Sequence, residues 1–190
     1  MPPPASGKTR DREHTRARIL EAAKVAFSQR GYAAANVREI AASAEINAAL
    51  VVRYFGSKEQ LFVAAVADAF ELPQALAGVS RAALGEAMAE MLFGEPAASD
   101  LMAMMLRATF EPTLSIQTRA LARSRMLEPL AKLIGGSQSE RRAAAVLALV
   151  TGVWIYRFGL PIDPYTDAND SEYKNFIATK IQYIIDENQL

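Results

Sequence analysis

Two short helix-forming stretches around a tight turn, at residues 36–55, constrain the fold of this chain more than any other feature. Asn36 and Asn47 can each cap the start of a helix, and Glu39 follows Asn36 by three residues as in a capping box. Apolar residues recur on one face of each stretch, at Val37, Ile40, Ala41, Ala44, Val51 and Phe55. Helices this short are not stable alone, so we expect both to be anchored on a small shared core.

The remaining sequence predicts further helices. A helix with apolar residues at three- and four-residue spacing precedes Gly31, and Ser57 with Gln60 opens another as a capping box. Proline and glycine then divide the chain into five segments, at roughly 79–93, 98–110, 114–134, 138–158 and 169–188, with Pro129 expected to kink its helix. Alanine is abundant and no strand alternation is visible, so we predict an all-α protein of about nine helices.

Composition excludes several classes of protein. The chain has no cysteine and a single histidine, His14, so we predict no metal site, no cofactor and no catalytic residues. The longest apolar run, 143–156, is shorter than the roughly 18–20 residues of a membrane span, and residues 1–13 lack the apolar stretch of a signal peptide. We therefore expect a cytoplasmic protein that is not an enzyme and has no membrane partner.

Charge is unevenly distributed although the net charge is zero. Residues 1–60 contain ten Lys or Arg against six Asp or Glu, whereas residues 61–190 contain eleven against fifteen. A basic N-terminal third indicates an anionic partner at that end of the chain, although a solvated basic helix would give the same count.

The 37–54 segment resembles the helix-turn-helix of DNA-binding proteins. The small Ala41 suits a helix crossing, and Ile46 can fill the corner between the helices. Val51 and Phe55 would hold the second helix against the core. The outer side of that helix then carries Ala48, Ala49, Val52 and Arg53.

Residues 12–65 also resemble the N-terminal domain of the TetR family of bacterial transcriptional regulators, most specifically in the signature Tyr54-Phe55-x-Ser57-Lys58-Glu59. The resemblance implies a flexible basic tail at 1–11, a three-helix DNA-binding domain at 12–57 and a larger helical ligand-binding and dimerisation domain at 58–190. The chain departs from the family at Glu45, where glycine is usual, and at Leu50, where threonine is usual. We expect Glu45 to adopt a left-handed conformation, which costs about 1 kcal/mol.

The candidate DNA-binding residues are Arg38, Asn47, Ala48, Ala49, Val52, Arg53, Tyr54 and Lys58. Arg53 can bind guanine O6 and N7 or a phosphate, and the Tyr54 hydroxyl can donate to a phosphate. Lys58 stands at a helix start, where the helix dipole disfavours a cation unless an anion binds there too.

The C-terminal two thirds of the chain suggest a ligand pocket and a dimer interface. The candidate ligand-binding residues are Met88, Met91, Met102, Met105, Arg107, Phe110, Met126 and Trp154. Methionine fills adaptable apolar sites, although each of these residues could equally be ordinary core. The candidate interface residues, on the last two long helices, are Ala145, Leu149, Tyr173, Ile177, Ile181 and Ile184; an internal core helix is the alternative.

Together these features predict a cytoplasmic, nucleoid-associated bacterial repressor. It would bind a palindromic double-stranded DNA operator as a homodimer and be released by a small apolar or amphipathic effector. The alternative is a helical carrier or interaction protein with a vestigial helix-turn-helix.

Overall fold

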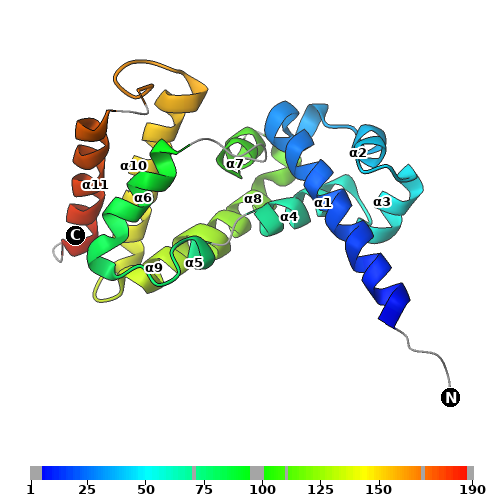
Figure 1. The fold of residues 1–190 in the computed structure, drawn as a ribbon, viewed down its shortest axis with the longest axis horizontal. Helices are drawn as coiled ribbons and strands as arrows, with labels where there is room; N and C mark the ends of the chain where they lie inside the picture. The colour runs from blue at the N-terminus through cyan, green and yellow to red at the C-terminus, as the bar shows by residue number, and fades with distance from the viewer. Residues whose placement is uncertain (1–5, 70–71, 95–100, 110, 168–169, 188–190) are drawn as a thin grey trace. The chain divides into compact units, whose positions relative to one another are not determined.

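The computed structural model describes residues 6–69, 72–94, 101–109, 111–167 and 170–187, and every regular element within these ranges is helical (Figure 1). This confirms the predicted all-α class. The chain forms two compact units, of which the first contains residues 1–70 and 97–121 and the second contains residues 71–96 and 122–190.

Unit 1 is built around the long helix α1. Its elements are α1 (Ser6–Ala34), α2 (Val37–Ser43), α3 (Ala48–Phe55), α4 (Lys58–Ala69), α7 (Leu101–Thr109), a 3-10 turn (Pro112–Leu114) and most of α8 (Ser115–Ala122). Helices α2, α4 and α7 pack on α1, and α3 packs on α2 and α4. Phe27, Tyr32 and Phe62 form an aromatic cluster in this core, with ring centroids 5.2 Å apart for Phe27 and Phe62.

The structure differs from the prediction at the N-terminal end of α1 and agrees with it at the C-terminal end. Residues 6–11, predicted as part of a flexible tail, are helical in the structure, while residues 1–5 lie outside the described residues. At the other end Gly31 interrupts the helix, as predicted, with a φ of 75° that side-chain-bearing residues rarely adopt. The chain then makes one further turn, through Tyr32 and Ala33, before α2.

Unit 2 contains the other helices. They are α5 (Leu72–Ala75), a 3-10 turn (Arg81–Ala83), α6 (Leu84–Phe93), a π-helical segment (Arg123–Leu127), α9 (Glu128–Ile134), α10 (Ser139–Trp154), a second π-helical segment (Ile155–Gly159) and α11 (Ser171–Asp186). The predicted long helices are present, and the irregular segment before α9 precedes Pro129. The short α5 was not predicted.

Helices α6 and α11 approach one another closely because Gly85 has no side chain. A Cβ at this position would lie 2.4 Å from the Ala178 carbonyl oxygen, so no larger residue fits without movement of the backbone. The Gly85 N–H donates to the side-chain oxygen of Gln182 at 2.9 Å. The contact therefore fixes the register of the two helices.

Two buried arginines hold helix ends together within unit 2. Arg142, on α10, is 0% exposed and donates to the carbonyl oxygens of Gly135, Ser137 and Ile185, at 2.5–2.7 Å. Arg157 donates to the carbonyl of Phe93 at 3.0 Å, at the end of α6. Both side chains bind the carbonyl-rich ends of helices, where positive charge is favourable.

Residues Ser139–Gly159 form a continuous helical run of 21 residues, which is long and apolar enough to cross a membrane by length and composition alone. The helical run is longer than the apolar stretch 143–156 because it also includes the polar residues 139–142 and the segment 157–159. The run contacts α9 and α11 and contains the buried Arg142 and Arg157, each bound to carbonyl oxygens. These contacts pack the run against neighbouring helices of unit 2, and 28% of its most apolar window is buried within the described structure.

Candidate nucleic-acid interface

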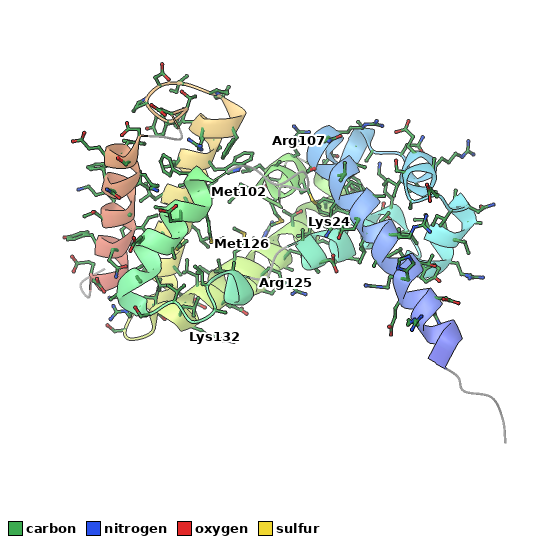
Figure 2. All side chains as sticks on the ribbon, in the orientation of Figure 1. Lys24, Met102, Arg107, Arg125, Met126 and Lys132 are labelled. Carbon is green, nitrogen blue, oxygen red and sulfur yellow. The ribbon has the colours of Figure 1, made fainter. Side chains whose placement is uncertain are left out.

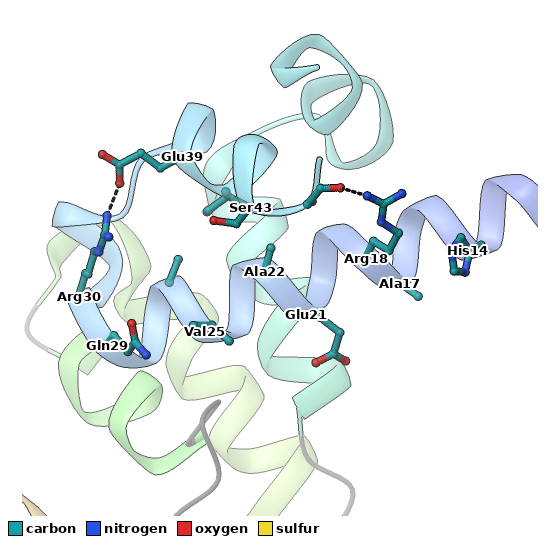
Figure 3. A pocket seen from close by; sticks show the side chains of 13 residues that line it. His14, Ala17, Arg18, Glu21, Ala22, Val25, Gln29, Arg30, Glu39 and Ser43 are labelled. Carbon is teal, nitrogen blue, oxygen red and sulfur yellow. Dashed lines mark hydrogen bonds and ion pairs between the residues drawn. The ribbon is translucent and has the colours of Figure 1, made fainter. Parts of the chain in front are cut away.

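The turn between α2 and α3 adopts the left-handed conformation expected at Glu45. Its φ is 51°, and the N–H of Ile46 bonds to the Ala41 carbonyl at 2.9 Å. Arg18, on α1, donates to the Ala44 carbonyl at 2.5 Å (Figure 3). It also pairs with the Glu45 carboxylate at 2.9 Å. Arg18 thus holds in place a turn that has glutamate at its left-handed position.

Both helices of the motif start at the predicted asparagine caps. The Asn36 side-chain oxygen accepts from the Arg38 N–H, and that of Asn47 accepts from the Ala49 N–H, each at 2.8 Å. These bonds satisfy backbone donors that a helix start would otherwise leave free. Asn47 therefore stabilises the start of α3, the helix whose outer face carries the candidate base contacts.

The outer faces of α2 and α3 border a groove of about 590 Å³. Five of the predicted DNA-binding residues line it, namely Arg38, Ala48, Ala49, Val52 and Lys58. Val52 is 55% exposed, and the small Ala48 and Ala49 leave room beside it. Arg53 is exposed next to Val52, with its guanidinium 5.8 Å from the ring centre of the half-buried Tyr54.

Lys58 is held at the start of α4 by two groups from the end of α1. Its Nζ donates to the Ala33 carbonyl at 3.2 Å and lies 4.5 Å from the ring centre of Tyr32. Ser57 caps α4 as predicted, accepting from the Gln60 N–H at 3.1 Å. The carbonyl and the ring offset the unfavourable dipole of α4 and place the ammonium group beside the groove.

A hydrogen bond between Tyr32 and Glu59 fixes the ring that Lys58 contacts. The Tyr32 hydroxyl donates to the Glu59 carboxylate at 2.8 Å. Burial, followed by this carboxylate, raises the pKa of Tyr32 to about 12. The N–H of Glu59 itself, the Ser57 hydroxyl and the Tyr32 hydroxyl lower the pKa of Glu59. Tyr32 therefore stays neutral and Glu59 charged at neutral pH, and the ring under Lys58 is fixed.

Replacing Lys58 with glutamine should weaken binding to specific and random DNA by similar factors, because a phosphate contact carries no sequence information. The slope of log affinity against log salt should fall by about 0.9. The free protein should lose up to about 1 kcal/mol, since the bond to Ala33 and the ring contact are weakened. Titration of both DNAs across a salt series measures these effects, and an unchanged slope would exclude a phosphate contact at Lys58.

A second groove, of about 570 Å³, lies between α1 and α2 in unit 1 (Figure 3). Ala22, Val25 and Ile40 are among its apolar residues, and the ion pair of Arg30 with Glu39 borders it. This pair and Arg18 tie α2 to α1. The groove contains none of the residues predicted to bind DNA or ligand.

The predicted ligand-binding residues are divided between the two units. Met102, Met105 and Arg107 lie on α7 in unit 1, while Met88, Met91, Met126 and Trp154 lie in unit 2; Phe110 is outside the described residues (Figure 2). Met88 and Met105 are buried, but Met91 is 46% exposed. Arg107 is exposed and donates to the Gln29 carbonyl of α1, so its side chain supports α1. The pocket itself stays a prediction.

The predicted interface residues do not share one exposed face. Ile177 and Ile181 are buried inside unit 2, where they pack in the core of the single chain. Ala145, Leu149, Tyr173 and Ile184 are half-buried. The exposed apolar side chains of α11 are instead Phe176 and Tyr183, and the preceding segment exposes Tyr156, Leu160 and Ile162.

Comparison with known proteins identifies relatives for both parts of the chain. Residues 19–65 match the family described as bacterial regulatory proteins, tetR family, and residues 82–185 match the tetracyclin repressor-like, C-terminal domain. An HTH-type transcriptional repressor of Mycobacterium tuberculosis is 51% identical over 57 residues, which cover 30% of this chain and 30% of the repressor. The sequence match thus spans less than a third of that curated relative.

Solved structures resemble the whole chain. A TetR-family regulator from a Rhodococcus species has a TM-score of 0.70 and 19% identity, covering 91% of this chain and 99% of its own. A transcriptional regulator from Saccharomonospora viridis, solved in complex with choline, has a TM-score of 0.66 and 20% identity, covering 93% of this chain and 97% of its own. At these identities the likeness concerns the fold alone.

Proposed function

The chain belongs to the TetR family of bacterial transcriptional regulators, DNA-binding proteins that are not enzymes, and from this premise we propose that it is a ligand-responsive repressor. It would bind a palindromic operator as a homodimer, one recognition helix α3 per half-site. A small apolar or amphipathic ligand would favour a conformation with the wrong half-site spacing and so release the DNA. Such a regulator acts in the bacterial cytoplasm.

The observation that carries this proposal is the outer face of α2 and α3. Arg38 and Arg53 are exposed there, and among the described residues neither meets a carboxylate at ion-pair distance. Small side chains beside them permit close approach to the floor of a major groove, and Val52 can touch a thymine methyl group. Cations without acidic partners beside a small-residue surface are what DNA recognition requires.

Support for repression and for a ligand comes from the relatives. The Mycobacterium tuberculosis protein, similar in its DNA-binding segment, is named a repressor, and one structural neighbour was solved with choline. For dimerisation the candidates are the half-buried Ala145, Leu149, Tyr173 and Ile184, with the exposed Phe176 and Tyr183 on the same helix as the latter pair.

The proposal is tested by selecting genomic DNA fragments with the purified protein and footprinting the strongest. Two protected half-sites related by a two-fold axis, about one helical turn or more apart, are expected. Binding at low salt without sequence preference, or no binding, would favour a carrier protein with a vestigial motif. A candidate ligand whose fluorescence shifts on binding the protein, and which also weakens operator binding, would be identified as the effector.

Replacing Arg53 with alanine should remove specific binding and leave the fold intact, because the side chain is exposed on the recognition helix. If Arg53 makes a bidentate base contact, the loss of operator affinity is about 1–3 kcal/mol, and discrimination at one base position relaxes. Titration of the selected operator and of variants changed at single positions checks this. Full operator affinity in the variant would rule out a base contact.

A further inference from the structure

We propose that the N-terminal turns of α1 form a second contact with the DNA backbone, made by Arg12 and Arg16 across the rings of Tyr54 and Phe55. The inference rests on the proposed function, since it assigns further residues to the same DNA-binding face. This contact adds to α3 a second element that fixes the position of the protein on the duplex.

Four arginines of α1 divide into two pairs by what they contact. Arg18 pairs with Glu45 at 2.9 Å and Arg30 pairs with Glu39, so both connect α1 to the helix-turn-helix. Arg12 and Arg16 instead lie over aromatic rings of α3: the Arg12 guanidinium is 5.8 Å from the ring centre of Tyr54, and that of Arg16 is 5.4 Å from the ring centre of Phe55. Two consecutive aromatic residues thus meet two arginines one helical turn apart.

The spacing of the two arginines puts them on one face of α1. Residues four apart in a helix lie on the same side and about 6 Å apart along its axis. Both side chains are exposed, and within the described part of the chain neither forms an ion pair with a carboxylate. Arg53 approaches the same Tyr54 ring from α3, at 5.8 Å. Three cations therefore surround two rings at the C-terminal end of the recognition helix.

An arginine beside an aromatic ring can still bind phosphate. A guanidinium lying over a ring uses one flat face and keeps the N–H groups at its edge free to donate. Those edge donors match two phosphate oxygens at once. The like charges repel one another in the free protein, and a phosphate between them removes that repulsion. Because Tyr54 also carries a hydroxyl that can donate to phosphate, we assign Arg12, Arg16 and this hydroxyl to one stretch of DNA backbone, beside the bases that Arg53 and the rest of α3 read.

Salt dependence of DNA binding tests the assignment. The probes are a genomic fragment selected by the protein and a random-sequence duplex, titrated with wild type, Arg12→Gln, Arg16→Gln and the double variant. Each lost phosphate contact should lower the slope of log affinity against log salt by about 0.9, which is about fivefold in affinity at 0.15 M salt. Both probes should lose affinity equally, and Arg12→Lys should retain most of the slope.

The control is Arg119→Gln, an exposed arginine on α8, which removes the same charge from outside the helix-turn-helix and should leave the slope unchanged. Thermal unfolding checks that each variant is folded. A double variant that is folded and keeps the wild-type slope overturns the proposal, as does one that changes base preference without changing the slope. Wild-type protein that binds neither probe would overturn the proposed function together with this contact.

Discussion

Replacing Arg142 with methionine should lower the free energy of unfolding of unit 2 by about 2–5 kcal/mol. The side chain is fully buried and binds three carbonyl oxygens, two of which, on Gly135 and Ser137, would then be left without the donor that satisfies them. A hydrogen bond from a charged donor contributes about 1.5–3 kcal/mol, and the variant loses all those that Arg142 makes. Against a typical total of about 5–15 kcal/mol, this is a severe loss.

Trp154 makes the effect measurable, since it is the only tryptophan of the chain and lies in unit 2. Its fluorescence during urea titration should show a transition at much lower denaturant concentration in the variant. The neighbouring Arg141 provides a matched control: it is exposed and donates to the Gln138 side chain, so Arg141→Met should change stability by no more than about 0.5 kcal/mol. Equal stabilities of the two variants would show that the carbonyl contacts of Arg142 contribute little.

Replacing Ile181 with glutamate should unfold unit 2 rather than merely separate two subunits. Ile181 is 0% exposed within a single chain, so the carboxylate would have to enter the core without a partner. The expected result is loss of the Trp154 unfolding transition or a shift as large as that of Arg142→Met. A well-folded Ile181→Glu variant would contradict the burial of this residue inside the subunit.

Phe176 offers the contrasting position on the same helix, because it is 52% exposed in the single chain. Phe176→Glu should leave the unfolding transition within about 0.5 kcal/mol of wild type. If the outer face of α11 carries the proposed dimer contact, sedimentation of this variant should show monomer where wild type is dimeric. A variant that sediments as a dimer would place the contact elsewhere.

The helix-turn-helix could be predicted in detail because local chemistry specifies it. Asn36, Asn47 and Ser57 cap their helices through bonds spanning two or three residues, and the left-handed Glu45 lies in a turn of fixed length. These interactions are encoded within a few positions of one another. The same holds for the helical class of the whole chain, which follows from periodicity and from the placement of proline and glycine.

What a helical face contacts could not be predicted in the same way. Ile177, Ile181 and Ile185 form a buried face of α11, but periodicity does not say whether α6 of the same chain or another subunit covers such a face. Arg142 stands in an alanine-rich helix as one charge among several, and its partner at Ile185 is 43 positions away. The ring contacts of Arg12 and Arg16 likewise could not be predicted, because the rings belong to α3, about 40 positions away in the sequence.

The return of the chain to unit 1 at α7 determines how its DNA-binding specificity could be transplanted. Arg107 of α7 binds the Gln29 carbonyl, and a Cβ at Gly31 would lie only 3.5 Å from the Cδ of Arg107. This contact adjoins Tyr32 and Ala33, the two groups that hold Lys58. A chimera in which only residues 1–70 are transferred to another regulator would pair α1 with a foreign helix at the point that positions this lysine. Helix α7 must therefore be transferred together with residues 1–70.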